Sequence, residues 1–322
     1  MTIQSKKTVI VTGGSGFIGT NLCVHLKQRG WRVFNVDIRE PQIAELKQDF
    51  ICADILDQKR VHQIINDLNP DSLVHLAART DLKGDSISAY NVNIEGTQNI
   101  CSSLEQSSRK IKSVFASSML VNRVGIIPED EFTFSPTTIY GRSKVISEYI
   151  IRSYNNPNFS IIRPTSIWGP WFQEPYANFF KSVLKGYFLK IKGISIVKSF
   201  GYVGNTVKQI EFAMEQNSDL GIKCYLGDTP SISVNDWADL IRKTADKEPN
   251  LTISADALQT LARFGDVINM VFPKFPITSF RYNNLITNNE YGSRHLIEIP
   301  QDQRIQLQEG VAETLKWLQQ KV

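Results

Sequence analysis

Short apolar runs alternate with amphipathic stretches through the first half of the chain. The β-branched run Thr8–Thr12 is followed, from Phe17 onward, by apolar positions that recur every three to four residues. The first pattern is typical of a buried strand and the second of a helix. Further strands are expected at 31–37, 50–53, 72–76, 111–116 and 159–162, and helices at 58–68, 87–105 and 143–154. Such alternation predicts parallel strands joined by helices that cover both faces of one sheet.

The rhythm changes beyond Arg163, where Pro164, Pro170 and Pro175 interrupt it. Helical patterns return at 179–186, 206–214, 234–245 and 304–320, and the run 223–226 could return a strand to the sheet. We therefore expect a doubly wound α/β fold of the Rossmann type with a smaller C-terminal lobe. The expected division places residues 1–165, with returning segments around 200–240, in a dinucleotide-binding domain, and residues 166–199 and 241–322 in a substrate-binding lobe.

The loop after the first predicted strand is rich in glycine. Gly13, Gly16 and Gly19 are spaced three residues apart between a strand and a helix, and Asp37 ends the next predicted strand. Glycine here permits a tight turn and close approach to a pyrophosphate, whose charge is favoured at a helix N-terminus. An acidic residue about 20 positions on can accept hydrogen bonds from the adenosine ribose. The pattern predicts a dinucleotide site that prefers NAD to NADP, although Asp37 could instead be a strand-ending turn residue.

Ser118, Tyr140 and Lys144, further along the same region, have the residue types and spacing of an acid–base site. Tyr140 and Lys144 are four residues apart, so on a helix they share a face. A neighbouring ammonium and a cationic nicotinamide both favour phenolate, which would let Tyr140 exchange protons near neutral pH. Ser118 follows a predicted strand at the carboxyl end, where ligands of such sheets bind, and can hold a substrate oxygen. The serine could alternatively belong to a strand-ending turn.

Composition narrows the class of protein. The 322 residues carry 36 basic and 32 acidic side chains, and a net charge of +4 is too small to favour nucleic acid as a partner. We find no signal peptide and no apolar run of membrane-spanning length. The four cysteines are too sparse for a disulfide framework and do not stand at metal-ligand spacing. We expect a cytoplasmic protein with no metal site, no nucleic-acid partner and no membrane attachment.

The motifs together resemble one family. They occur in this order: Thr12-Gly-Gly-Ser-Gly-Phe-Ile-Gly19, Asp37, Asp54, His75-Leu-Ala-Ala78, Asn93 with Gly96-Thr97, Ser117-Ser118, Tyr140-x-x-x-Lys144 and Arg163-Pro164. Over about residues 8–245 the set is similar to the extended short-chain dehydrogenase/reductases, in the NAD-dependent nucleotide-sugar epimerase/dehydratase group. The resemblance implies NAD as cofactor, a nucleotide-linked sugar as substrate, and a homodimer formed through the helices expected at 87–105 and 138–154.

The resemblance also implies roles for single residues. Ser118 would be the active-site hydroxyl, Tyr140 the acid/base, and Lys144 the residue that holds the nicotinamide ribose and lowers the pKa of the tyrosine. Besides Tyr140 and Lys144, the residues that border the cofactor would be Gly13, Gly16, Phe17, Ile18, Gly19, Asp37, Asp54, Ile55, Ala77, Ala78 and Asn93. Substrate contacts would come from Ser166, Lys198 and Arg281, although the two cations could equally be solvated surface residues. The aromatic stretch 168–176 could wall a sugar ring or pack the small lobe.

One departure from the family pattern guides the choice of reaction. Sugar dehydratases of the family carry an Asp-Glu pair just after the active-site hydroxyl, where this chain has Met119 and Leu120, which cannot move protons. We therefore expect an epimerase that moves a hydride transiently between the sugar and NAD. The alternatives are a keto-sugar reductase that uses NAD(P)H and, in another class, a non-catalytic cofactor-sensing or scaffold protein.

Overall fold

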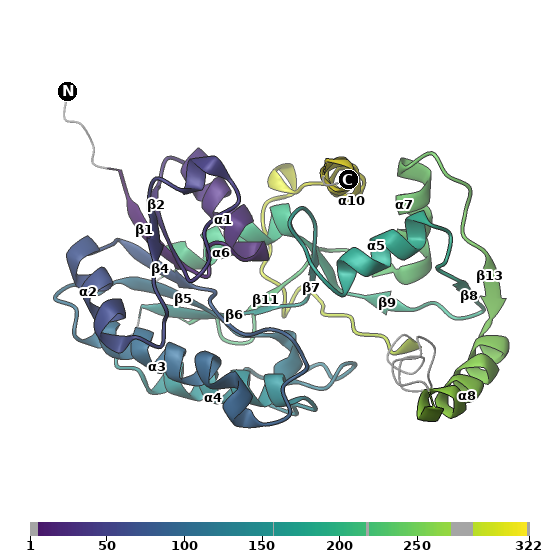
Figure 1. Cartoon of the computed structure of the whole chain (residues 1–322), viewed down its shortest axis with the longest axis horizontal. Helices are drawn as coiled ribbons and strands as arrows, with labels where there is room; N and C mark the ends of the chain where they lie inside the picture. Colours follow the sequence, from purple (N-terminus) through teal and green to yellow (C-terminus); the bar gives the residue numbers. More distant parts are fainter. Residues whose placement is uncertain (1–5, 157, 217–218, 272–285, 321–322) are drawn as a thin grey trace.

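The larger unit is built around a parallel sheet (Figure 1). The computed structural model describes residues 6–156, 158–216, 219–271 and 286–320, and seven strands lie in the order β11–β6–β5–β4–β1–β2–β3. They are β1 (Thr8–Thr12), β2 (Arg32–Asp37), β3 (Phe50–Cys52), β4 (Ser72–His75), β5 (Lys112–Ala116), β6 (Phe159–Pro164) and β11 (Tyr225–Leu226). Every neighbouring pair is parallel, so the predicted doubly wound α/β sheet is confirmed.

Helices cover both faces of this sheet. Contacting helices α1 (Phe17–Gln28) and α6 (Val203–Glu215) lie on one face, and α2 (Gln58–Leu68), α3 (Asn91–Glu105) and α4 (Ile139–Ser153) lie on the other. Side chains along β1 alternate between the two layers: Val9 and Val11 join the core with α1 and α6, whereas Ile10 joins the core with α2 and α3. Burial on both faces explains why the strands read as continuous apolar runs.

Two helix predictions differ from the structure at the N-terminal end. The helix expected at 87–105 is a 3₁₀ turn, η2 (Ile87–Tyr90), followed by α3. Helix α4 begins at Ile139, four residues before the start taken from the apolar pattern and close to the span 138–154 that the resemblance implied, because the Thr138 hydroxyl caps it by accepting a hydrogen bond from the Gly141 N–H at 2.9 Å. The earlier start places Tyr140 in the first turn of α4.

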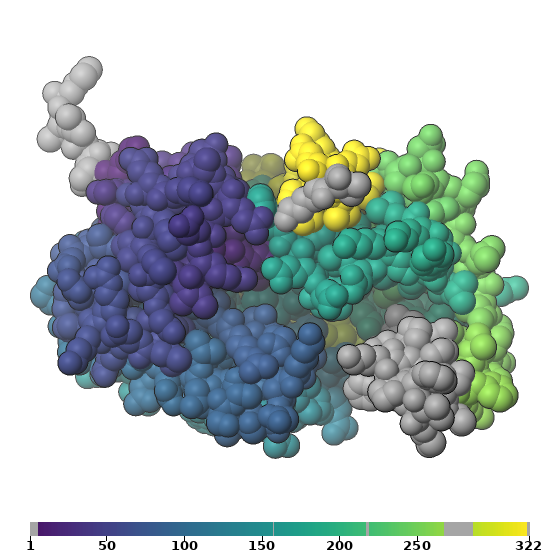
Figure 2. All heavy atoms as spheres, viewed as in Figure 1, coloured from purple at the N-terminus to yellow at the C-terminus, as the bar shows by residue number. Residues whose placement is uncertain are grey.

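Within the described residues, the second half of the chain forms short strand pairs and, besides α6, four further helices. β7 (Ser166–Trp168) pairs with β10 (Phe200–Tyr202), β8 (Lys190–Lys192) with β13 (Thr252–Ser254), and β9 (Val197–Lys198) with β12 (Ile232–Ser233). The helices are α5 (Tyr176–Leu184), α7 (Val234–Thr244), α8 (Ala255–Val271) and α10 (Leu307–Gln319), and the 3₁₀ turns η1 (Ala44–Leu46), η3 (Met119–Val121) and η4 (Gln301–Gln303) complete the assignment. In Figure 2, yellow α10 lies on the surface beside the teal and green parts that include α5 and α7.

An aromatic cluster joins the two halves of the molecule. Trp168 is fully buried, with its ring 5.3 Å from Trp237 and 5.6 Å from Phe180 between centroids. These rings belong to the same buried core as Leu22 of α1. The aromatic stretch therefore packs the lobe at Trp168 rather than facing solvent there. The segment around 200–240, which was predicted to return to the large domain, contributes α6 and β11 to the unit with the parallel sheet. Helix α7 packs instead on α5 and α10. The division into two lobes stays a prediction.

Candidate active site

The predicted site residues follow strands that meet at one edge of the large sheet. The strand order reverses between β1 and β4, and Thr12 of β1 is in register with both Val36 of β2 and His75 of β4. The glycine loop, Asp37, residues 76–78 and Ser117-Ser118 come directly after β1, β2, β4 and β5 or end them. In open α/β sheets this edge, at the reversal point, is where ligands bind.

The glycine loop has no room for side chains at two positions. Gly13 has a φ of +72°, and a β-carbon added there would lie 2.6 Å from the Ala77 backbone nitrogen. A β-carbon at Gly19 would lie 2.1 Å from the Gly13 carbonyl oxygen. At Gly16, which precedes α1, the added atom would meet only the Gly13 oxygen, at 3.1 Å. The loop is thus packed tightly against β4 and α1 but open at Gly16, as a backbone cradle for a pyrophosphate requires.

The Asp37 carboxylate lies beside this loop. It accepts hydrogen bonds from the Ser15 N–H at 3.1 Å and from the Arg39 N–H at 3.0 Å. The Asn35 amide donates to the Ser15 hydroxyl at 3.0 Å, which ties the loop to β2 a second time. The structure therefore brings together the glycine loop and the acidic residue that the sequence analysis paired.

The other predicted cofactor residues line the same region in different ways. Phe17 and Ile18 open α1 and are partly buried against the core. Asp54 is exposed and its carboxylate accepts from the Leu56 N–H at 2.9 Å, while Ile55 is buried. Ala77 and Ala78 follow β4 and are partly buried. These positions fit a wall around the loop, and their contacts with a cofactor stay a prediction.

Asn93 has a bridging role that its motif did not reveal. Its side-chain oxygen accepts from the Arg79 N–H at 2.8 Å, and its amide donates to the Arg79 carbonyl at 3.0 Å. The amide also donates to the Ser143 hydroxyl at 3.0 Å. Asn93 therefore fastens the loop after β4 to α4, and its polar atoms are used within the protein.

Ser118, Tyr140 and Lys144 are brought together at the carboxyl end of β5. The Tyr140 phenol interacts with Ser118, which acts to lower the pKa of the phenol, and the Ser118 hydroxyl accepts a hydrogen bond from the Leu120 N–H at 3.1 Å. Lys144 lies one turn along α4, and its ammonium donates to the Ala116 carbonyl at 2.9 Å. All three side chains are buried. The arrangement can hold a hydroxyl oxygen between Ser118 and Tyr140 and move its proton.

Burial dominates the electrostatics of this group. Burial raises the pKa of the Tyr140 phenol to about 12, while its hydrogen bond with Ser118 acts in the opposite direction. Burial lowers the pKa of the Lys144 ammonium to about 8, and the negative charge of Glu148 opposes that shift. The protein groups therefore do not produce the predicted fall of the tyrosine pKa, because desolvation outweighs them. Such a fall would need the positive charge of the nicotinamide.

Two neighbours of the site were not assigned a role from the sequence. The ring of Tyr90, at the end of η2, lies 6.0 Å from the ring of Tyr140 and covers one side of it. His75 contacts the hydroxyl oxygens of Thr12 at 2.7 Å and Thr97 at 3.3 Å, and burial lowers its pKa to about 3. Tyr90 lay within the helix expected at 87–105 but in none of the quoted motifs, whereas His75 stood in a quoted motif and is a neutral packing residue.

Two of the predicted substrate residues, Ser166 and Lys198, lie in different strands of the described structure. Ser166 is buried in β7 and interacts with Tyr176 of α5. Lys198 ends β9, is partly buried, and has its pKa lowered by burial. Arg281 lies outside the described residues. The roles of all three in substrate binding therefore stay predictions.

A cavity of about 940 Å³ lies apart from these residues. Its lining includes Asn205 of α6, Asp228 after β11 and Arg304 near α10, and none of the predicted cofactor or catalytic residues. The Asp228 carboxylate accepts from the Tyr202 N–H at 2.6 Å and from the Asn205 amide at 2.9 Å. These bonds tie β11 to α6, so we regard the polar groups here as part of the fold.

The described residues contain neither a candidate membrane-spanning helix nor a candidate metal cluster. In the parts of the chain that the structure describes, no helix is both long and apolar enough to cross a membrane. Within the same residues, no three His, Cys, Asp or Glu side chains cluster in a way that could hold a metal ion.

Comparisons with known proteins agree on one family. The model of the NAD dependent epimerase/dehydratase family matches residues 9–223. The chain is 28% identical over 253 residues to N-acetyl-alpha-D-glucosaminyl-diphospho-ditrans,octacis-undecaprenol 4-epimerase of Escherichia coli O157:H7, covering 74% of this chain and 73% of that protein. It is 29% identical to 3-beta-hydroxysteroid dehydrogenase of Mycolicibacterium neoaurum over 64% of this chain and 60% of that one.

A solved structure extends the likeness to the second half. UDP-glucose 4-epimerase from Thermotoga maritima, solved with UDP-glucose, has a TM-score of 0.68 at 20% identity, covering 98% of this chain and 99% of that one. The similarity of fold thus extends beyond the residues that the family model matches.

Proposed function

Because the chain belongs to the NAD dependent epimerase/dehydratase family, we propose that it is an NAD-dependent epimerase of a nucleotide-linked sugar. The observation that carries the proposal is the grouping of three buried side chains at the carboxyl end of β5: Ser118, Tyr140, and Lys144 one turn along α4. The Escherichia coli relative is named as an epimerase of a sugar linked through a diphosphate to undecaprenol, which supports epimerisation of a sugar. The Thermotoga enzyme solved with UDP-glucose supports a nucleotide-linked substrate.

The residues of the glycine loop and of α4 fit NAD. When bound, NAD supplies an acceptor and a donor for a hydride. The loop from Gly13 to Gly19 would hold the pyrophosphate at the N-terminus of α1. A β-carbon at Gly13 or at Gly19 would collide with backbone atoms, so glycine is needed at both positions for the loop to pack this closely. Asp37 would bind the adenosine ribose, and Lys144 would bind the nicotinamide ribose.

The work of this chain in the reaction is proton transfer and positioning. Ser118 would hold the hydroxyl oxygen of the sugar, and Tyr140 would take the proton of that hydroxyl and later return it. Lys144, as a cation, would stabilise the phenolate that this transfer needs. The burial of all three side chains keeps water from the reacting atoms.

The experiment that tests the proposal is incubation of the purified protein and catalytic NAD with a panel of UDP-hexoses, followed by chromatography of the products. The proposal predicts that one UDP-hexose is converted to a stereoisomer, while the amount of reduced cofactor does not change. A keto-sugar reductase, and equally a dehydrogenase such as the mycobacterial relative is named for, would instead change the reduced cofactor in step with product. Cofactor binding without any product would favour the non-catalytic alternative.

We expect NAD to bind at least tenfold more tightly than NADP, a difference of about 1.4 kcal/mol. The Asp37 carboxylate is held beside the glycine loop by two backbone N–H groups, so a 2′-phosphate there would meet a fixed like charge. Titration of both cofactors, followed by quenching of tryptophan fluorescence, measures the ratio. Asp37→Ala should narrow the gap, and equal affinities in the wild type would remove Asp37 from the account.

We also expect no loss of water from any nucleotide-hexose. Met119 begins η3 directly after Ser118, and Leu120 follows it, so no acidic side chain stands there to move protons from the sugar carbons. Mass spectrometry of the incubated sugars decides the matter. A product lighter by one water would show that the dehydratase reaction does not need the acidic pair, and would contradict the choice of epimerase.

The proposal includes a homodimer in the cytoplasm. Ile146 and Tyr149 of α4 are exposed, three residues apart on the helix face turned away from Lys144, as a helix-to-helix contact between two copies would need. Four cysteines without disulfide bonds are compatible with a reducing compartment. Sedimentation of the wild type against Tyr149→Glu tests the dimer.

A further inference from the structure

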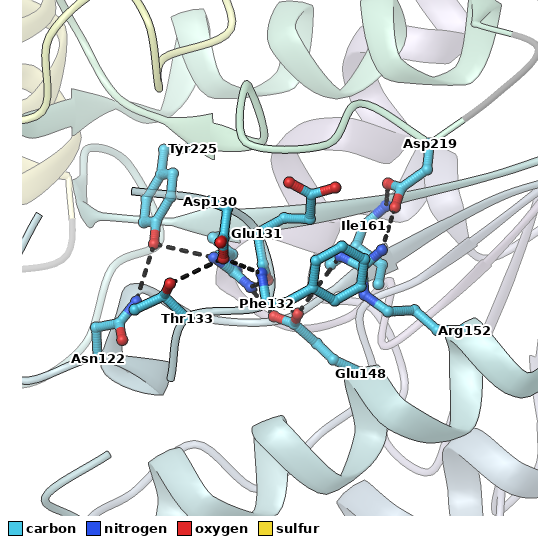
Figure 3. A network of polar contacts seen from close by, with 11 residues as sticks. Asn122, Asp130, Glu131, Phe132, Thr133, Glu148, Arg152, Ile161, Asp219 and Tyr225 are labelled. Atoms are coloured by element: carbon cyan, nitrogen blue, oxygen red, sulfur yellow. Dashed lines mark hydrogen bonds and ion pairs between the residues drawn. The ribbon is translucent and has the colours of Figure 1, made fainter. Parts of the chain in front are cut away.

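A buried ion pair lies one turn beyond the proposed catalytic lysine (Figure 3). The guanidinium of Arg163 donates to both carboxylate oxygens of Glu148, at 2.9 and 2.8 Å, and neither side chain is exposed at all. Arg163 also donates to the Tyr225 hydroxyl at 3.2 Å and to the Glu131 carbonyl at 2.6 Å. One arginine of β6 therefore binds α4, β11 and the loop before α4.

The carboxylate of this pair belongs to the same helix face as the catalytic group. Tyr140, Lys144 and Glu148 are spaced four residues apart on α4, so their side chains lie one above the other. The negative charge of Glu148 acts on the Lys144 ammonium, which is itself fixed to the Ala116 carbonyl at the end of β5. The order along the helix is thus phenol, ammonium and carboxylate, and Arg163 binds the carboxylate.

We propose that Glu148 is a positioning residue for the reaction: its charge keeps Lys144 cationic, and its bond with Arg163 holds α4 against β6. The proposal rests on the proposed function and deepens it. A buried ammonium needs a nearby anion to stay charged, and Glu148 supplies it. Arg163 in turn fixes the Glu148 carboxylate by an ion pair at 2.8 Å, in which neither side chain is exposed.

The other titratable groups around Lys144 do not supply this charge. Burial, together with the charge of Lys144, lowers the pKa of His75 of β4 to about 3, so its imidazole is neutral. Tyr140 of α4 is a neutral phenol with a pKa of about 12. Arg152, the next charged residue on this face of α4, is a cation 3.9 Å from Glu148 and forms its own ion pair with Asp219 at 2.5 Å.

The test is the pH dependence of NAD binding, measured by titration calorimetry on the whole chain. If Lys144 binds the cofactor as a cation, the Kd of the wild type should rise as the pH passes about 8. In Glu148→Met/Arg163→Met, which removes both buried charges, the rise should begin about 1 pH unit lower. A purely structural role would weaken binding equally at every pH. Glu148→Gln is a second neutral variant, whose amide oxygen can still accept from Arg163.

Three controls make the outcome decisive. Glu148→Asp keeps the charge and should restore the wild-type pH dependence. Arg152→Gln/Asp219→Asn removes the neighbouring ion pair of α4 but leaves Glu148, and should shift nothing. Lys144→Met should abolish the pH dependence in this range. Rises at the same pH in the wild type and in both neutral variants would overturn the proposal, and a wild type that binds no NAD at any pH would overturn the proposed function with it.

Discussion

Tyr140→Phe is expected to slow hydride transfer by about 10²–10⁴-fold, the usual contribution of general acid–base catalysis. The substitution keeps the ring, its packing against Tyr90 and the helix, and removes only the oxygen bonded to Ser118. Single-turnover absorbance of the reduced nicotinamide, recorded after a substrate is mixed with the protein and NAD, measures the rate. The affinity for NAD should stay near the wild-type value because the glycine loop and Asp37 are unchanged.

Lys144→Ala is the matched comparison for this variant. It should lose both rate and NAD affinity, since the same ammonium is proposed to serve the phenolate and the cofactor. The double variant should be little slower than the poorer single one, because residues that act as a unit are not additive. Hydride transfer at the wild-type rate in Tyr140→Phe would show that another group is the acid/base.

Arg163→Met should destabilise the fold by about 3–5 kcal/mol, the typical cost of leaving one member of a buried ion pair without its partner. The remaining Glu148 carboxylate would be fully buried, and the Glu131 carbonyl would lose a donor. Equilibrium unfolding in urea, monitored by circular dichroism, gives the free energy of unfolding.

The control is Glu148→Met/Arg163→Met, which removes both charges. Replacing a whole buried pair by apolar side chains is often close to neutral, so the double variant should recover most of the stability lost in the single one. If Arg163→Met unfolds at the same urea concentration as the wild type, water or a rearranged side chain satisfies Glu148, and the ion pair does not hold α4 in place.

The sequence predicts those parts of the site that depend on local spacing. The glycine loop could be recognised because four of the seven residues 13–19 are glycine, where a strand leads into a helix, and Asp37 could be recognised because it ends the next strand. Tyr140 and Lys144 could be paired because four residues make one helical turn. In each case the chemistry follows from residues that are close in the chain, or from the parallel order of neighbouring strands.

Contacts between distant segments could not be predicted in this way. Glu148 and Arg163 are joined only because α4 packs on the face of β6, and local spacing pairs Glu148 with Arg152, four residues on, rather than with Arg163. The three short strand pairs were missed because two or three residues are too few to display a period. The tyrosine pKa also depends on burial, which outweighs the opposing effect of Ser118 and is set by tertiary packing.

The fate of deuterium in the sugar tests the central claim most directly. The protein and NAD would be incubated with a nucleotide-hexose deuterated at its ring carbons, in the presence of excess unlabelled NAD, and the product isomer analysed by mass spectrometry and NMR. The account predicts an epimer that retains its deuterium, because the hydride removed from the sugar is returned to the same molecule. An oxidised or reduced product, with the label in the free cofactor or missing from the sugar, would contradict it.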